Sequence, residues 1–131
     1  MFRNRSRLLK RALVQGSRSI LIVEDEPLIA MMLEDFLLSL GYGVAGICES
    51  VGEALARIEQ GGFDLAIVDV HLKGGEQVWP VADRLAEMGI PFALATGGHI
   101  EPPPAAHARA PILAKPFTID AIAPILAEAC R

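Results

Sequence analysis

Five short apolar runs alternate with segments of helical periodicity along this sequence, and this alternation restricts the fold more than any other feature. Each run consists mainly of β-branched or small apolar residues and is bounded by Gly, Pro or charged residues, as in strands covered on both faces. The five predicted strands are residues 19–23, 44–47, 65–68, 92–95 and 112–114. Because right-handed crossovers place helices on both faces of a parallel sheet, the alternation predicts an α/β fold.

Helical segments follow four of the five predicted strands. Pro27 suits the first turn of a helix, and Leu33 and Leu37 behind it lie on one apolar stripe. Gly41 is expected to end that helix, and Ser50 is placed to cap the next one. A third helix is expected to turn one apolar face to the core, made up of Val78, Val81, Ala82, Leu85 and Met88.

The crossover from the fourth strand to the fifth is the place where the alternation is weakest. Three consecutive prolines at residues 102–104 prevent a regular helix, and Pro111 ends whatever follows. One or two turns around residues 105–110 are expected, so the fourth helix is irregular or shortened. A last helix is expected over residues 118–129, where Pro124 should remove a backbone hydrogen bond and bend the axis.

The length of 131 residues and an apolar share of 52% fit one globular domain. Basic residues concentrate ahead of the first strand, because six of the 12 Lys and Arg residues and no acidic residue precede Glu24. We interpret residues 1–17 as a basic extension, for which a solvated tail is the leading explanation and contact with an acidic partner, nucleic acid or a membrane surface the alternative. The domain itself is expected over residues 18–131.

Several function classes lack support in the sequence. The longest apolar runs are only a handful of residues, far short of the roughly 20 residues of a transmembrane helix. The first 18 residues lack the long apolar core and the small-residue cleavage site expected of a secretory signal. A chain of this length is also expected to have no separate DNA-binding domain. Cys48 and Cys130 have no ligand-like spacing to each other or to the histidines, so zinc binding is not indicated. We expect a cytoplasmic protein with reduced thiols and Cys48 as a small core residue.

Polar residues follow the predicted strands at their carboxyl ends. Glu24 and Asp25 follow the first strand, Asp69 follows the third, Thr96 the fourth and Lys115 the fifth. In open α/β sheets these strand ends form one edge, where ligands bind. Carboxylates gathered at one edge repel one another unless a cation joins them, and Mg²⁺ takes oxygen ligands of this kind. The sequence therefore indicates a magnesium site at this edge.

Each of these residues also has a plainer explanation. The acidic turn at residues 24–26 would suit the positive end of a helix dipole, Asp69 would cap a strand, and Thr96 and Lys115 would be ordinary turn and surface residues. We prefer the chemical interpretation because all of them fall on one edge. Asp69, preceded by four apolar residues, is then a nucleophile toward phosphorus, while Lys115 and Thr96 hold phosphoryl oxygens.

In their order along the chain, these motifs resemble the receiver domain of two-component response regulators. They are the apolar run ILIV with Glu24-Asp25-Glu26-Pro27 behind it, then Val68-Asp69, Ala95-Thr96-Gly97 and Lys115-Pro116-Phe117. The resemblance covers about residues 19–131. It implies a flavodoxin-like, three-layer α/β/α fold in which five parallel strands follow the order 2-1-3-4-5.

The resemblance also implies a role for each residue of the edge. Asp69 accepts a phosphoryl group from a sensor histidine kinase or a histidine phosphotransfer protein, so the chain is a signalling switch rather than an enzyme. Thr96 and Lys115 contact the phosphoryl oxygens, and the bond before Pro116 is expected to be cis. The implied ligands of Mg²⁺ are Asp69 and Asp25 directly, Glu24 through water, and the backbone carbonyl of His71. A downstream protein target is implied, and homodimer formation is left open.

Two departures from the family pattern concern the conformational readout. Ile112 stands three residues before the lysine, where many receivers have Tyr or Phe. The fourth strand is similar to that of a subgroup that reads Phe-Ala-Thr-Gly, but Leu94 replaces the Phe. Members of that subgroup often have an aromatic residue three positions past the threonine, where this chain has His99.

Three hypotheses on function follow, in decreasing order of support. The first is a receiver whose phosphorylation changes partner binding through the face of the fourth helix and fifth strand. The second is a receiver-shaped scaffold that does not switch, which Ile112 and the proline-rich crossover favour. The third is a small α/β hydrolase or phosphatase with Asp69 as nucleophile, which lacks a second carboxylate close to Asp69 in sequence.

Overall fold

The computed structural model describes residues 18–97 and 102–129. Its strands form one parallel sheet in the order β2-β1-β3-β4-β5. They are β1 (Ser19–Val23), β2 (Gly43–Cys48), β3 (Leu65–Asp69), β4 (Phe92–Thr96) and β5 (Ile112–Ala114). The predicted flavodoxin-like fold and strand order are confirmed, and β2 extends one residue beyond its apolar run at each end.

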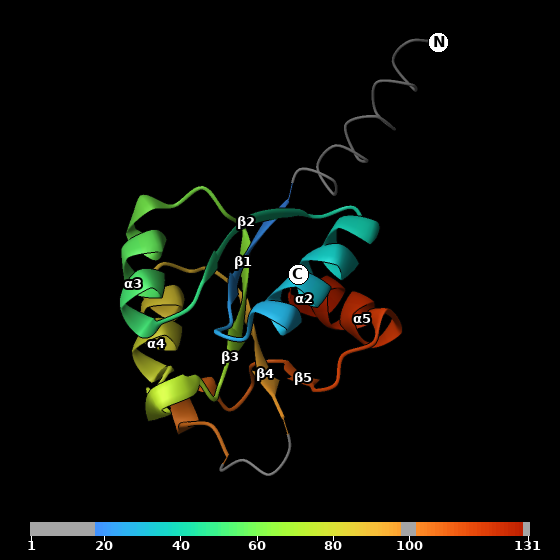
Figure 1. Ribbon diagram of the computed structural model, residues 1–131. Coiled ribbons are helices and arrows are strands. Elements are labelled where there is room, and N and C mark those ends of the chain that lie inside the picture. Colours follow the sequence, from blue (N-terminus) through green and yellow to red (C-terminus); the bar gives the residue numbers. More distant parts are fainter. Residues whose placement is uncertain (1–17, 98–101, 130–131) are drawn as a thin grey trace.

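The helices lie on both faces of this sheet. They are α2 (Pro27–Ser39), α3 (Val51–Gln60), α4 (Trp79–Glu87) and α5 (Ile119–Ala129), with short 3₁₀ helices η1 (Lys73–Gly75) and η2 (Ala105–His107). In Figure 1, α3 and α4 cover one face, and α2 and α5 cover the other. The result is the three-layer arrangement that right-handed crossovers produce.

Local signals in the sequence set the helix ends. Pro27 begins α2, and the Ser50 hydroxyl accepts a hydrogen bond from the Glu53 amide at 3.1 Å, so the predicted cap of α3 is confirmed. Gly41 follows the end of α2 with φ of +92°, a backbone conformation that glycine adopts without strain. Because α2 begins at Pro27, residues 24–26 form the short loop that joins β1 to α2.

Buried apolar side chains form one cluster on each face of the sheet. Leu21 and Val23 belong to the cluster under α3 and α4, whereas Ile20 and Ile22 belong to the cluster under α2 and α5. Successive side chains of a strand point to opposite faces, so a central strand such as β1 must be apolar at every position. Full burial of each such side chain contributes about 1.5–3 kcal/mol to folding.

In residues 102–111, the described part of the crossover from β4 to β5, the one helical element is η2, which is three residues long. Pro104 is the N-cap residue of this turn, and the strand β5 begins directly after Pro111. The prediction of a shortened fourth helix is therefore confirmed. Pro124 does lie inside α5, as the sequence indicates.

One residue predicted for the core lies at the surface. The periodicity of the third helical segment places Met88 beside Val81 and Leu85, but Met88 is 40% exposed, so this prediction is wrong. Its position explains the difference, because α4 ends at Glu87 and Met88 is the C-cap residue. The helical repeat no longer determines the direction of a side chain beyond the last helical residue.

Some expectations concern residues that the structure does not describe. The basic extension at residues 1–17, His99 and Cys130 lie outside the described ranges. Cys48 is buried, in agreement with its prediction as a core residue. No helix within residues 18–97 and 102–129 is long and apolar enough to cross a membrane.

Candidate functional site

The carboxyl ends of β1, β3, β4 and β5 meet at one edge of the sheet, where the polar residues singled out in the sequence lie. Backbone hydrogen bonds hold the segments that leave the strands: the amides of Glu24, Val70 and Lys115 donate to the carbonyls of Cys48, Ala95 and Thr96 at 2.9, 2.9 and 2.7 Å. Parallel pairing therefore continues to the residues that carry the side chains of the site.

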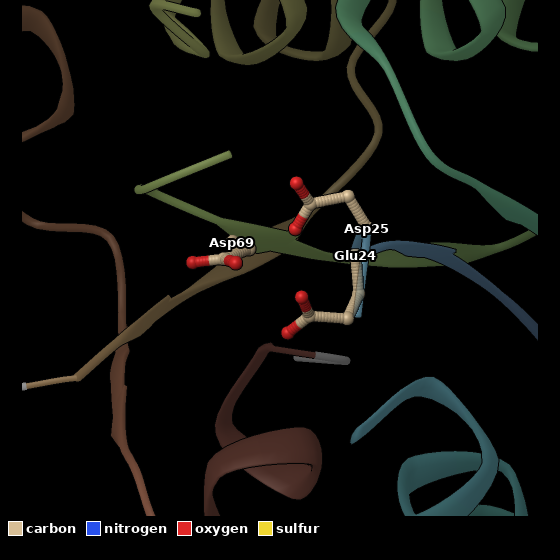
Figure 2. A group of neighbouring side chains, drawn as sticks. All are labelled: Glu24, Asp25 and Asp69. Carbon is tan, nitrogen blue, oxygen red and sulfur yellow. The ribbon is translucent and has the colours of Figure 1, made fainter. Parts of the chain in front are cut away.

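Three carboxylates converge at this edge. Figure 2 shows the carboxylates of Glu24 and Asp25 extending from the end of β1 toward Asp69 at the end of β3. Each of the three offers an oxygen atom such that these atoms all lie within 4.8 Å of one another. Glu24 and Asp69 are almost fully buried, at 1% and 2% exposure. Buried carboxylates this close together require a cation.

Lys115 supplies part of that positive charge. Its ammonium Nζ donates to Glu24 Oε1 at 2.8 Å and to Asp69 Oδ2 at 3.1 Å, while the Lys115 side chain is 17% exposed. One ammonium group thus bridges the ends of β1 and β3 from the end of β5. With three carboxylates against one ammonium group, the cluster still has an excess of negative charge.

The pKa values of the bridging groups are shifted by this arrangement. Burial raises the pKa of the Glu24 carboxyl, and the charge of Asp69 raises it further, while hydrogen bonds from Lys115 and the Glu26 amide oppose the shift. For Lys115, burial lowers the pKa, but hydrogen bonds and charge attraction to Glu24 and Asp69 outweigh burial, so its pKa lies above the usual value. Lys115 is therefore a cation at physiological pH.

Backbone amides complete the contacts of the two buried carboxylates. The Glu26 amide donates to Glu24 Oε2 at 3.1 Å, and the His71 amide donates to Asp69 Oδ1 at 3.0 Å. Asp69 thus accepts one hydrogen bond on each oxygen, from His71 on one side and from Lys115 on the other. His71, whose backbone carbonyl is the predicted metal ligand, therefore lies close to Asp69, because its amide donates to the Asp69 carboxylate.

Thr96 and the bond before Pro116 border the same cluster. Thr96 is the last residue of β4 and is 5% exposed, and its carbonyl accepts the hydrogen bond from the Lys115 amide. The Lys115–Pro116 peptide bond is cis, as the resemblance implies. The structure therefore brings all six residues predicted for the site to one edge of the sheet.

The donor set fits a small divalent cation. Carboxylate oxygens are hard ligands of the kind Mg²⁺ binds, and opposite ligands of one Mg²⁺ ion lie about 4.2 Å apart. The observed limit of 4.8 Å between the offered oxygens is close to that spacing, so a small movement, or a water between the ion and one carboxylate, is enough. The net negative charge of the cluster supplies the driving force.

An open cleft of about 320 Å³ adjoins the cluster. It is lined by Ile29, Met32, Gly97, Lys115, Pro116 and Phe117. Leu28 and Met31, which precede the lining residues Ile29 and Met32 on α2, are 81% and 57% exposed. The charged site therefore adjoins a cleft with apolar lining residues, and exposed apolar side chains are present on the same helix.

The sequence of residues 20–101 matches a family described as the response regulator receiver domain, and this match covers more than half of the chain. The chain belongs to the response regulator receiver family. The acidic cluster of Glu24, Asp25 and Asp69 is typical of the magnesium site of a receiver. This receiver is therefore a two-component signalling domain and not an enzyme that turns over a metabolite, so the hydrolase hypothesis is not supported.

Solved structures of other receivers are similar to this one. The solution structure of SdrG from Sphingomonas melonis Fr1 is 51% identical, covers 88% of this receiver and 98% of its own chain, and has a TM-score of 0.79. The BeF₃-activated conformation of SdrG from Pseudomonas melonis Fr1 is 52% identical, with coverage of 86% and 96% and a TM-score of 0.75. PhyR from Brucella abortus is 30% identical with a TM-score of 0.73, and its match covers 95% of this receiver and 54% of PhyR. A comparison with curated proteins finds no match.

Two pairings in this receiver are not apparent from its sequence. Glu24 is the nearer partner of Lys115, although a metal-bound water is its only role in the resemblance. His107, for which the sequence indicates no role, is buried, and its Nε2 lies 2.7 Å from Asp83 Oδ1. Both pairs join residues far apart along the chain, so no local spacing signals them. The one available signal for His107 is its place as a polar residue within a very short turn.

Proposed function

We propose that Asp69 of this receiver accepts a phosphoryl group and that its phosphorylation switches partner binding. The observation that carries the proposal is the setting of the Asp69 carboxylate, which is buried at the end of β3 with an amide donor on one oxygen and the Lys115 ammonium on the other. These donors orient the carboxylate and compensate charge where a phosphoryl group would bind.

The proposed reaction is a phosphoryl transfer from a phosphohistidine. An oxygen of Asp69 attacks phosphorus, a new O–P bond forms, and the P–N bond to the donor imidazole breaks. The imidazole leaves with the bonding electron pair and takes up a proton, and the product is an acyl phosphate on Asp69. The receiver needs no acid or base of its own for this step, because the donor supplies the leaving group.

The acidic cluster would hold Mg²⁺ during this transfer. Asp69 and Asp25 would bind the ion directly, Glu24 through water, and the His71 carbonyl would complete the protein ligands. The ion would neutralise the carboxylates and the negative charge of the incoming phosphoryl group. What supports this assignment is the close approach of three carboxylates with a single ammonium group among them.

Lys115 and Thr96 would respond to the new phosphoryl group. The Lys115 ammonium group would give up one of its hydrogen bonds to a carboxylate oxygen and donate to a phosphoryl oxygen instead. The Thr96 hydroxyl would donate to a second phosphoryl oxygen. The BeF₃-activated conformation described for SdrG supports a change of state in a receiver that is about half identical in sequence. The BeF₃ group on an aspartate has the shape of a phosphoryl group, so the same reagent suits this receiver.

A protein donor is a better fit to the surroundings of Asp69 than a small molecule alone. The apolar residues Leu28 and Met31 are exposed on α2 beside the cleft that Lys115 lines. A helix of a sensor histidine kinase or histidine phosphotransfer protein that packed there would bring its phosphohistidine to the edge of the sheet. We expect the donor to contact these residues.

Labelling by acetyl phosphate tests the proposed function. Wild-type protein should gain one phosphoryl group in the presence of Mg²⁺ and none in EDTA, and Asp69→Asn should gain none. Asp35→Asn, at an exposed position of α2, is the matched control and should label like the wild type. Phosphate-affinity electrophoresis reads out the product. A wild-type protein that takes up no label would favour the scaffold hypothesis.

A further inference from the structure

His107 is a buried histidine outside the phosphoacceptor site. Its side chain is 4% exposed, whereas that of its partner Asp83 on α4 is 60% exposed. The two are joined by a hydrogen bond of 2.7 Å between His107 Nε2 and Asp83 Oδ1, in which the ring nitrogen donates because an ionised carboxylate only accepts. This bond ties η2 to α4.

Two aromatic rings enclose His107. Trp79, the chain's one tryptophan, stacks on His107 with a centroid distance of 6.1 Å and an interplanar angle of 12°. Phe92 of β4 meets the same imidazole edge-on at 5.6 Å. Within residues 102–111, the described part of the crossover that leads into β5, His107 is the one buried side chain. The crossover is therefore anchored to the rest of the domain mainly through this ring.

Trp79 connects this anchor to Asp69. It is the first residue of α4 and ends the loop that begins directly after Asp69. The loop is closed by a bridge between His71 and Gln77, and the His71 amide donates to Asp69 Oδ1. A change at that oxygen therefore acts on the loop at one end, and the Trp79 ring lies at its other end.

A movement of the crossover would change the surface of the domain around β5. The crossover precedes β5, an edge strand of three residues in which Ile112 is 42% exposed. Two aromatic ring contacts, of His107 with Trp79 and of His107 with Phe92, lie next to this crossover. Aromatic packing that could transmit a change thus lies around η2.

We propose that His107 is a positioning residue of the switch, which couples occupancy of Asp69 to the β4–β5 crossover through its stacking on Trp79 and its hydrogen bond to Asp83. This inference rests on the proposed phosphorylation of Asp69. When a phosphoryl group and a metal ion engage Asp69, the hydrogen bond from the His71 amide is altered, and the loop and Trp79 move. His107 follows because it is held between Trp79 and α4, and the crossover moves with it.

The test follows the Trp79 indole resonance by NMR and the hydrogen exchange of residues 102–111, before and after addition of Mg²⁺ and BeF₃⁻. The wild type should show a shifted indole resonance and a change of about threefold or more in exchange across the crossover. Asp83→Ala, at a largely exposed side chain, should label at Asp69 like the wild type and lose most of the exchange response. His107→Phe should keep the stacking and lose the hydrogen bond, with the same loss, and Asp35→Asn is the control.

The outcomes separate this inference from the proposed function. A wild type that is labelled by acetyl phosphate but shows no change at Trp79 or in the crossover would overturn the coupling and leave the phosphoacceptor role standing. Variants at Asp83 and His107 that respond like the wild type would also overturn it, because this result is expected if His107 only packs in the core. A wild type that is not labelled at all would overturn both.

Discussion

Lys115 is the side chain on which the charge balance of the site depends. It donates to both buried carboxylates, so its removal leaves Glu24 and Asp69 without their compensating ammonium group. Loss of one partner from a fully buried ion pair costs about 3–5 kcal/mol, and the cost here is smaller because the Lys115 side chain is 17% exposed.

For Lys115→Ala we therefore expect the free energy of unfolding in EDTA to fall by about 1–3 kcal/mol. Mg²⁺ should restore part of this loss, because the ion compensates the same carboxylates. Labelling by acetyl phosphate should persist, but the BeF₃⁻ response of the crossover should weaken. Urea unfolding followed by circular dichroism measures the stability. An unchanged stability in EDTA would show that the ion pair does not contribute to folding.

Glu24 makes stability depend on pH in a definite direction. Because its pKa in the folded protein is raised above the ordinary value of 4.5, the folded state binds this proton more tightly than the unfolded chain does. The contribution of the group to stability is therefore largest below pH 4.5 and is lost as the pH rises through the raised pKa.

Comparison of the wild type with Glu24→Gln in EDTA checks this sign. As the pH rises above 4.5 and through the raised pKa, the wild type should lose stability relative to the variant. Addition of Mg²⁺ should reduce the difference, because the ion compensates the ionised carboxylate. Urea unfolding at several pH values provides the curve. Parallel curves for the two proteins would mean that Glu24 does not titrate in this range.

The roles of single residues could be anticipated from the sequence only in part. Strand ends in a parallel sheet share one edge, so the gathering of Asp69, Thr96 and Lys115 follows from their positions after apolar runs. The pairing of Lys115 with Glu24, and of His107 with Asp83, depends on side-chain directions across strands and crossovers. No periodicity in the chain encodes those directions.

Among the elements, α2 presents an apolar surface beside the site. Leu28 and Met31 lie one turn apart at the start of α2 and remain exposed, although the opposite side of the helix packs Leu33 and Leu37 into the core. Exposed apolar side chains at this place favour an interface with another protein.

The substitution Leu28→Asp tests whether α2 receives the donor. It should lower the rate of phosphoryl transfer from a histidine kinase or phosphotransfer protein by about tenfold or more, as expected for an interface anchor. Labelling by acetyl phosphate should stay within about twofold of the wild type, because the buried site is untouched. Leu38→Asp, at a similarly exposed position near the other end of α2, is the control. Equal rates from the protein donor in all three proteins would exclude this surface.

The elements themselves were the most predictable level of the structure. Central strands buried on both faces require continuous apolar runs, and the prolines at residues 102–104 exclude a full helix in the crossover, so both features follow from the sequence. The exposure of Met88 could not be predicted in this way. Its place in a helical repeat does not reveal that α4 stops one residue earlier.

At the scale of the whole molecule, binding of Mg²⁺ should stabilise the folded state, because the unfolded chain has no assembled acidic cluster. Mg²⁺ at ten times its dissociation constant adds about 1.4 kcal/mol, which raises the melting temperature by about 5 °C for a domain of this size. Asp25→Asn should abolish most of this shift. Differential scanning calorimetry at constant ionic strength measures it, and an equal shift with NaCl would show that no specific site exists.

The domain as a whole combines the receiver fold with a crossover that has little regular structure in its described part. The strand order and the acidic cluster are those of the receiver family, and the crossover to β5 contains the three-residue turn η2 with its buried histidine. A single change at Asp69 can reach the edge strand through the few contacts that hold this turn.

The identity of the phosphorylated residue is the most direct test of the account. The receiver is treated with acetyl phosphate and Mg²⁺, the product is reduced with borohydride, and peptides are sequenced by mass spectrometry. Borohydride converts an aspartyl phosphate to homoserine, so we predict homoserine at position 69 in this sample and in no sample with EDTA. Homoserine at another carboxylate, or unmodified Asp69 under conditions that label a known receiver, would contradict the account.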